Sequence, residues 1–571
     1  MRAISLATLS FAVMAAPAGA QPFSDVVRTS QYVQVRDGTR LAVNIYRPAN
    51  GARPAGARMP VIFAFTPYRA RFRAENGQVE EAGLSDRLAL RSLIRAGYVV
   101  AVADIRGKGA SFGARRGFQD RTEARDGYDL VQWLARQDFS TGRVGMIGCS
   151  YLGGTTFHTA SMAPPALRAI FVGASDLDKY SFVRRGGITA QFNTRPDEPP
   201  AVDLASIPVD GDDGRLLRQA VAEHANNTPM AGLWYGMPYR DSVSSFTGNA
   251  FWEEAAIYRY LAAIRGAGIA TYFWGNWQDE PTAHSILSAE NMGGRFLAGP
   301  GGHCVPPPGF DFTGEIRRYF DQHLKGVDPG PALRPRATYW VEGEGWVRSS
   351  RLPGADARYR DWHFSGDRSN SARSTNDGVL SPRPGAPGRD SFTVDYNLPG
   401  ADYFAFWARP MDAHGLSYTS PPLAEPLRLI GFPIVSVTAS VDRRDAHLWV
   451  YLDQVDAAGN AEVVAFGRLA FSHHRTARPP FRMLGLPWHS GLARDVAPVT
   501  PGAAVRMDVD LTPVARVVPA GARLRVTIAG ADPRQRNLAE VRQNPPPIIS
   551  ILRGTANPSR LRLPVSIQAS R

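Results

Sequence analysis

The sequence predicts a doubly wound α/β domain, interrupted by a helical insertion and followed by an all-β domain. Apolar strand patterns alternate with amphipathic helical patterns from residue 61 to residue 324, which is typical of a mostly parallel sheet. The alternation pauses between about residues 180 and 266, where the chain is aromatic, polar and helix-leaning. Beyond about residue 353, short strands follow one another between Gly, Pro and Asp turns. We therefore expect an α/β domain over 21–352, with 180–266 as its lid, and a jelly-roll β-sandwich over 353–571.

The α/β domain is expected to open with a β-hairpin over residues 31–48. Apolar and polar residues alternate on both sides of Asp37-Gly38, a dipeptide that favours a two-residue hairpin turn. Short apolar runs then predict buried strands, and apolar residues spaced by three and four predict the helices between them. The expected strands cover 61–65, 98–103, 144–147, 169–172, 270–274 and 295–298, and the expected helices cover 86–96, 123–136 and 315–324.

The C-terminal region is expected to be built from short strands without strong helices. Its strands alternate apolar and polar residues and are bounded by turn residues, as in two packed antiparallel sheets. The clearest of them cover 427–430, 434–439, 448–452, 463–469 and 524–528.

The first 20 residues resemble a secretory signal peptide. Arg2 precedes a short apolar stretch, and Ala18-Gly19-Ala20 matches the small-residue cleavage pattern, so we expect cleavage after Ala20 and a secreted or periplasmic protein. No later segment reaches the roughly 18 apolar residues of a membrane-spanning helix, so no integral membrane segment is expected.

Composition bears on the possible partners of the chain. The net charge of +13 comes mostly from arginines that are scattered and form no basic run, which indicates a solvated surface and no nucleic-acid partner. A homo-oligomer is compatible with the sequence. The two cysteines, Cys149 and Cys304, would meet an oxidising compartment after export, where they could pair.

A strand-to-helix turn around Ser150 predicts a catalytic nucleophile. Gly148-Cys149-Ser150-Tyr151-Leu152-Gly153-Gly154 follows an expected strand and opens an expected helix, the context of the nucleophile elbow in α/β-hydrolases. Such a turn holds Ser in a strained conformation with its hydroxyl exposed, and small neighbours let the strand and helix approach. The usual pattern places Gly two residues after Ser, where this chain has Leu152. A glycine-rich turn without catalysis is the alternative interpretation.

A serine nucleophile requires a base and an orienting carboxylate, and both are found after later strands. In α/β-hydrolases the order along the chain is Ser, acid, His. Asp279 follows the strand expected at 270–274, and His303 follows the strand expected at 295–298. We therefore expect Ser150, Asp279 and His303 to form a triad. Glu280 follows Asp279 directly and is the alternative acid.

The chain resembles the cocaine esterase and X-prolyl dipeptidyl peptidase family, which includes α-amino-acid ester hydrolases and glutaryl-cephalosporin acylases. The resemblance covers nearly the whole chain after the expected signal peptide. Its matching stretches are 67–68, 104–111, 126–133, 148–153, 277–279, 299–303, 319–321, 325–326, 418–423 and 431–433.

The resemblance implies roles for five residues. Ser150 would be the nucleophile, His303 the base and Asp279 the acid, while the Tyr68 hydroxyl and the Tyr151 backbone N–H would form the oxyanion hole. A packed aromatic at a strand end is the alternative for Tyr68. The loop before His303 departs from the family, because it reads Gly-Pro-Gly-Gly-His where an aromatic residue often lies two places before His.

The cysteines lie beside two of these residues. Cys149 precedes Ser150 and Cys304 follows His303, so a triad would bring both thiols close together. The arrangement is similar to the Cys-Ser…Asp…His-Cys pattern of tannases and feruloyl esterases, and this local resemblance implies a disulfide. Two buried free thiols are the alternative.

The expected function is cleavage of an ester or amide by a serine hydrolase through an acyl-Ser150 intermediate. An α-amino-acid ester hydrolase or β-lactam side-chain acylase is an alternative, in which Asp176, Asp178 and Glu280 would bind a substrate amino group unless they are surface or helix-capping carboxylates. A non-catalytic jelly-roll binding protein is a further alternative. Neither a cofactor nor a metal is expected, because the remaining histidines, including His158, His284, His473 and His474, form no ligand pattern.

Overall fold

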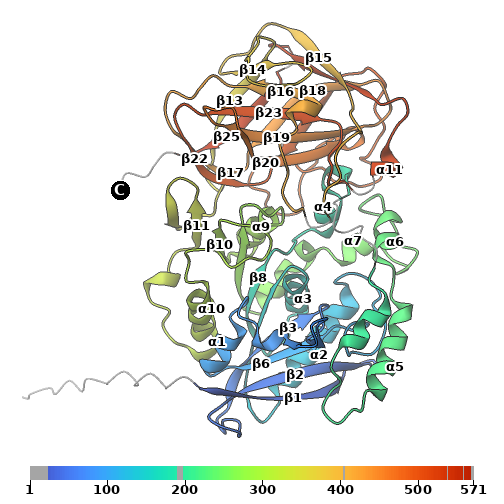
Figure 1. The fold of residues 1–571 in the computed structure, drawn as a ribbon, viewed down its shortest axis with the longest axis vertical. Helices are drawn as coiled ribbons and strands as arrows, with labels where there is room; N and C mark the ends of the chain where they lie inside the picture. The colour runs from blue at the N-terminus through green and yellow to red at the C-terminus, as the bar shows by residue number, and fades with distance from the viewer. Residues whose placement is uncertain (1–22, 190–196, 403–404, 536–537, 557, 567–571) are drawn as a thin grey trace, which may run out of the picture.

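The computed structural model describes residues 23–189, 197–402, 405–535, 538–556 and 558–566, so the expected signal peptide lies outside the described residues. These residues form two parts stacked along the long axis of the molecule (Figure 1). The N-terminal part is built on a ten-stranded sheet and the C-terminal part on a thirteen-stranded sheet. The predicted combination of an α/β domain with an all-β domain is confirmed.

The ten-stranded sheet is parallel at its centre and antiparallel at its edges. Its order is β1-β2-β6-β3-β7-β8-β9-β10-β11-β12, with parallel pairing from β6 through β11. The strands are β1 (Asp25–Gln34), β2 (Arg40–Ala49), β3 (Met59–Thr66), β6 (Val99–Asp104), β7 (Ser140–Cys149), β8 (Leu167–Gly173), β9 (Ala270–Asn276), β10 (Arg295–Gly299), β11 (Ala337–Val341) and β12 (Gly345–Ser349). A separate hairpin pairs β4 (Arg71–Arg73) with β5 (Val79–Glu81).

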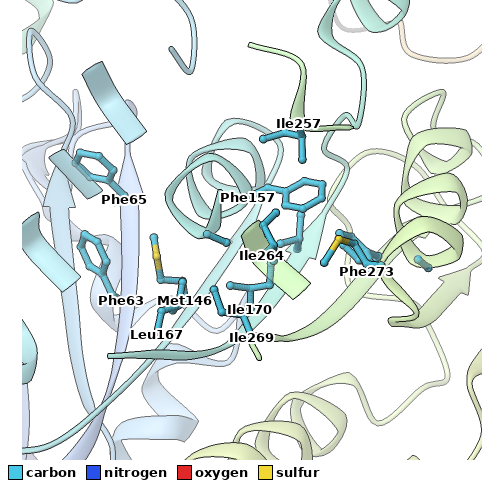
Figure 2. Close-up of a cluster of buried hydrophobic side chains, with 14 of the residues drawn as sticks. Phe63, Phe65, Met146, Phe157, Leu167, Ile170, Ile257, Ile264, Ile269 and Phe273 are labelled. Atoms are coloured by element: carbon cyan, nitrogen blue, oxygen red, sulfur yellow. The ribbon is translucent and has the colours of Figure 1, made fainter. Parts of the chain in front are cut away.

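Helices cover both faces of this sheet, as a doubly wound fold requires. The helices are α1 (Leu90–Arg95), α2 (Arg121–Ala135), α3 (Tyr151–Ala160), α9 (Thr282–Met292) and α10 (Phe312–Phe320). Apolar side chains of α2, α3 and α9 share one core with the sheet, and those of α1 and α10 share the core on the other face. In Figure 2, Phe157 of α3 lies over Met146, Ile170 and Phe273 from three neighbouring strands. The buried sheet therefore fixes α3 directly above its centre.

Three local features differ from the sequence prediction. Helix α1 begins at Leu90 and not at residue 86, because Ala89 adopts the left-handed conformation with φ 56°. Helix α10 begins at Phe312, earlier than predicted, because the Asp311 carboxylate accepts the Gly314 N–H at 2.9 Å and caps it. The hairpin of β11 and β12, which extends the sheet, was not predicted.

The insertion between β8 and β9 is helical where it is described, as predicted. It contains α4 (Lys179–Val183), α5 (Arg215–Glu223), α6 (Met230–Tyr235), α7 (Phe251–Glu254) and α8 (Leu261–Gly266). Trp234 and Trp252 stack at 5.2 Å in a small apolar core of its own. Helix α4 lies at the junction with the upper part in Figure 1. Helix α4 therefore lies between the two parts of the molecule, while α5 packs on the N-terminal part through Leu217 and Val221.

The C-terminal part is all-β apart from short helical turns. Its strands are β13 (Arg358–Ser365), β14 (Gly378–Ser381), β15 (Gly388–Thr393), β16 (Gly415–Thr419), β17 (Leu427–Gly431), β18 (Ile434–Val441), β19 (His447–Val455), β20 (Ala461–Ala470), β21 (Val505–Asp510), β22 (Val514–Val518), β23 (Arg523–Ala529), β24 (Ile548–Arg553) and β25 (Arg560–Val565). The five strands expected from the sequence correspond to β17 to β20 and β23. Within the described ranges, no helix is long and apolar enough to cross a membrane.

Candidate active site

Ser150 lies in the tight turn between β7 and α3, in a backbone conformation that side chains rarely adopt. Its φ of 60° and ψ of −129° lie outside the helical and strand regions. The Ser150 N–H donates to the Gly173 carbonyl of β8 at 3.0 Å, which holds the turn above the strand ends. These features are those of a nucleophile elbow.

The glycines of the turn explain why Leu152 is tolerated. A Cβ on Gly148 would lie 2.1 Å from the Leu152 carbonyl oxygen, and a Cβ on Gly153 would lie 2.3 Å from the Gly173 carbonyl oxygen. The close approach of α3 to β8 thus falls on the third residue after Ser150, so the second can carry a side chain. The departure from the usual glycine spacing is accommodated without loss of the turn.

Asp279 and His303 are brought together at the carboxyl ends of β9 and β10. His303 Nδ1 lies 3.0 Å from both carboxylate oxygens of Asp279. Burial raises the pKa of the Asp279 carboxyl, and His303 opposes that shift. This contact leaves Nε2 as the nitrogen that can exchange a proton with a substrate or nucleophile.

Glu280 points elsewhere and does not contact His303. Its carboxylate lies 2.8 Å from Arg468 of β20 and 3.5 Å from Arg185 of the insertion. Burial alone would raise the pKa of Glu280, but Arg468 and Arg185 hold it below its ordinary value. Glu280 therefore joins the catalytic part to the all-β part, and Asp279 is the carboxylate positioned to orient the imidazole.

A disulfide joins the nucleophile turn to the His303 loop. Cys149 and Cys304, separated by 155 positions in sequence, are bonded with a Cα–Cα distance of 5.9 Å. The predicted bridge is confirmed.

Among the described residues, no hydrogen bond joins the Ser150 hydroxyl to His303. In enzymes without substrate such contacts are often long and tighten on binding.

Tyr68 and Tyr151, the two oxyanion donors expected from the sequence, lie together, and Tyr151 directly follows Ser150. Tyr68 follows β3 and is 49% exposed, and its ring packs edge-on against Tyr151 at 6.4 Å. Its backbone is fixed by donation from the Tyr68 N–H to Thr66 Oγ1 at 3.0 Å. Tyr151 is the first residue of α3, so its N–H has no intrahelical acceptor and lies at the positive end of the helix dipole. This group can donate to developing negative charge.

Two side chains that were not predicted from the sequence hold Tyr151 in place. Its hydroxyl donates to Glu123 Oε2 at 2.8 Å, and its carbonyl accepts from Gln119 Nε2 at 3.0 Å. Burial is the main cause that raises the pKa of Glu123 to about 8. Glu123 lies in the first turn of α2 and Gln119 in the turn just before that helix, and the polar residues on the buried face of α2 were the available signal for Glu123.

The all-β part also reaches His303. The ring of Phe406 stacks on the imidazole with centroids 4.4 Å apart and 25° between the planes. No sequence pattern indicated this contact, because Phe406 lies in a different domain. Gly301 occupies the place two residues before His303 where the related family often has an aromatic residue.

The three carboxylates considered for binding an amino group are all paired with internal cations; Asp176 and Asp178 are buried, and Glu280 is partly buried. Asp176 lies 2.6 Å from Lys179, and Asp178 forms a two-point contact with Arg240 at 2.6 and 2.8 Å. Glu280 has the arginine partners described above. None of the three is fully exposed, and the Asp178 carboxylate, although at the N-cap position of α4, makes no capping hydrogen bond. Their charges are already compensated. The described residues contain no group of three or more His, Cys, Asp and Glu side chains that could hold a metal ion.

Ser150 lies in a strained turn of an α/β sheet, and a disulfide links this turn to the loop of His303, which contacts Asp279. This combination defines a serine hydrolase. The chain belongs to the family of serine hydrolases that includes X-Pro dipeptidyl-peptidases and cocaine esterase. Residues 37–305 match the family of the X-Pro dipeptidyl-peptidase (S15 family). Residues 330–544 match the family of the X-Pro dipeptidyl-peptidase C-terminal non-catalytic domain. The resemblance indicated by the sequence motifs is confirmed.

Individual relatives agree with this assignment. The chain is 28% identical to a Mycobacterium bovis protein provisionally named a serine esterase, over 94% of this chain and 95% of that protein. It is 26% identical to cocaine esterase of Rhodococcus over 65% of this chain and 67% of that enzyme. A CocE/NonD family hydrolase from Staphylococcus aureus has the same fold, with a TM-score of 0.72, 17% identity and coverage of 95% and 94% of the two chains. An α-amino acid ester hydrolase also shares it, with a TM-score of 0.69, 18% identity and coverage of 98% and 100%.

Proposed function

We propose that this chain is an exported serine esterase that cleaves esters of uncharged acyl groups through an acyl-Ser150 intermediate. The contact of His303 Nδ1 with both oxygens of Asp279, in a loop bonded to the neighbour of Ser150, is the observation that carries this proposal. The signal-like first 20 residues and the disulfide support export, since such bonds persist in oxidising compartments. The N-terminus of the mature protein is then Gln21, which N-terminal sequencing of the exported protein checks.

The reaction proceeds in two acyl-transfer steps. Ser150 Oγ attacks the ester carbonyl while His303 Nε2 takes its proton, and Asp279 stabilises the resulting imidazolium. The Tyr68 hydroxyl and the Tyr151 N–H donate to the oxyanion. His303 then returns the proton to the leaving alcohol. A water molecule, deprotonated by the same imidazole, releases the acyl group from Ser150.

The charge balance near the site favours an uncharged acyl group over an α-amino acyl group. A substrate ammonium would need a carboxylate, but Asp176, Asp178 and Glu280 already bind Lys179, Arg240 and Arg468. Displacing these buried cations would leave charges unpaired, which is costly in a protein interior. Aminoacyl esters and Xaa-Pro peptides are therefore the second candidates.

A substrate panel with an active-site probe tests this proposal. We expect a fluorophosphonate to label the wild type and not Ser150→Ala, and simple p-nitrophenyl acyl esters to be cleaved with a higher kcat/KM than aminoacyl esters or Xaa-Pro anilides. His303→Ala should lose nearly all turnover while keeping the wild-type circular dichroism spectrum. Labelling of Ser150→Ala would contradict the nucleophile, and preference for aminoacyl substrates would contradict the acyl specificity.

A further inference from the structure

A buried ion pair beside the nucleophile turn is connected by one side chain to the backbone of Tyr151. Lys179 Nζ lies 2.6 Å from Asp176 Oδ2 and 2.5 Å from Gln119 Oε1. The other end of the same amide, Gln119 Nε2, donates to the Tyr151 carbonyl at 3.0 Å. Exposure is 3% for Asp176, 0% for Lys179 and 2% for Gln119, so water does not compete for these contacts.

The chemistry of the two neighbours fixes the orientation of the Gln119 amide. An ammonium only donates hydrogen bonds, so Lys179 requires the amide oxygen on its side. The Tyr151 carbonyl only accepts, so it requires the amide nitrogen. The hydrogen bonds that connect Asp176, Lys179, Gln119 and Tyr151 therefore have only one possible arrangement of donors and acceptors.

The backbone around Gln119 is adapted to this contact. Gln119 has a φ of 55°, a left-handed conformation that is unfavourable for a residue with a side chain. Its amide crosses α3 at Gly154, where a Cβ would lie 1.9 Å from Gln119 Nε2. Placing the Gln119 amide against Tyr151 therefore requires both the strained backbone of Gln119 and the lack of a side chain at Gly154.

Fold stability alone is a weak reason for such an arrangement. Burying a lysine and an aspartate together costs desolvation that their attraction only roughly offsets, and apolar replacements of buried ion pairs are often as stable. The arrangement does fix Tyr151 at its carbonyl, while Glu123 fixes its hydroxyl at 2.8 Å. Tyr151 also carries the backbone N–H that the proposed mechanism aims at the oxyanion.

We propose that Gln119 and Lys179 are positioning residues that hold the Tyr151 N–H in place for the oxyanion. This inference rests on the proposed function, since it assigns a role within that reaction. Removing an oxyanion donor outright lowers kcat by about 10²–10³-fold. Because these residues act only through Tyr151, their loss should lower kcat by roughly tenfold, a smaller effect than loss of the donor.

Two sets of substitutions test the proposal with a p-nitrophenyl acyl ester. Gln119→Glu keeps an acceptor for Lys179 and, with its carboxylate ionised, has no donor for the Tyr151 carbonyl. Asp176→Asn combined with Lys179→Met removes the ion pair without leaving an unpaired charge. For both we expect kcat to fall roughly tenfold with KM within about twofold, and fluorophosphonate labelling to slow in parallel. Lys179→Arg, which retains a cationic donor, should keep most of the wild-type kcat.

A matched control separates positioning from general damage. Arg106 and Asp126 form another buried ion pair of the same domain, with a contact of 2.6 Å, that does not touch Tyr151. Arg106→Met combined with Asp126→Asn should change Tm but not kcat. Unchanged kcat in the Gln119 and Lys179 variants, or an equal loss of kcat in the control, would overturn the positioning role. If the double variant does not fold, Gln119→Glu decides alone. A wild type that neither cleaves esters nor reacts with the probe would instead overturn the proposed function.

Discussion

The ring of Phe406 stacks on the imidazole of His303 at a centroid distance of 4.4 Å. His303 follows Gly301 and Gly302, so the chain before it contributes no side chain that could restrain the ring. An aromatic face at this distance limits rotation of the imidazole and attracts the positive charge that it acquires during acyl transfer. The all-β part therefore contributes to the proposed catalytic site and does not only cover it.

Replacing Phe406 tests this contribution. We expect Phe406→Ala to lower kcat roughly tenfold with little change in KM, because the imidazole loses an orienting contact worth about 0.5–1.5 kcal/mol. Phe406→Tyr preserves the ring and should retain most of the activity. Steady-state kinetics of the three proteins on one ester provides the measurement. Equal kcat values for wild type and Phe406→Ala would show that the stacking has no effect on turnover.

The hydroxyl of Tyr68 can be removed with little change in shape. Tyr68→Phe should lower kcat by about 10²-fold or more, with a smaller change in KM, if that hydroxyl donates to the oxyanion. The ring lies 6.4 Å from Tyr151 and remains in Tyr68→Phe, so Tm should stay close to the wild-type value. Unchanged turnover would reduce Tyr68 to a packing residue and place the second donor elsewhere.

The disulfide should be detectable both chemically and functionally. We expect Cys149 and Cys304 to resist alkylation in denatured, unreduced protein and to react after reduction. Closing a loop of 155 positions corresponds to about 5 kcal/mol in the chain-entropy model, so Cys149→Ala combined with Cys304→Ala should lower Tm clearly. Reduction should also lower activity before the protein unfolds, because the His303 loop loses its anchor. Alkylation of either thiol without reductant would contradict the bridge.

The Glu280 ion pairs predict a loss of stability in acid. In the folded protein Arg468 and Arg185 hold the pKa of Glu280 below its ordinary value of 4.5. The stabilisation is therefore complete above that pH and is lost as the pH falls through the lower folded-state value. Tm measured from pH 3 to pH 7 should show Glu280→Gln well below wild type at pH 7, with the gap narrowing below about pH 4.5. The exposed Glu425 provides the control, since Glu425→Gln should leave the profile unchanged.

Sequence patterns predicted the parts of the site that depend on strand ends. Ser150, Asp279 and His303 each follow an expected strand, and parallel strands bring their carboxyl ends to one edge of the sheet. The disulfide followed from the same reasoning, because Cys149 and Cys304 adjoin two of those residues. These predictions needed only the order of strands and helices along the chain. In this fold each helical connection leads from one parallel strand to the next, so the carboxyl ends of the strands always meet at the same edge.

The remaining contacts could not be predicted, because they involve segments that do not follow a strand of the parallel sheet. Phe406 reaches His303 from another domain, and Gln119 reaches Tyr151 from a turn with an unusual backbone conformation. The spacing of three between Asp176 and Lys179 was a usable signal for an internal ion pair, but it did not reveal Gln119. Side chains whose partners depend on tertiary packing need the three-dimensional structure.

With two cysteines in the sequence, only one intramolecular pairing exists. Oxidative folding of this chain therefore has no scrambled disulfide isomer to correct, and the competing product is a cross-link between chains. In the folded protein the bond joins the end of β7 to the loop that follows β10, so folding brings its two halves together. Assembly of the central sheet thus favours closure of the bridge, and the closed bridge in turn holds these two strand ends together.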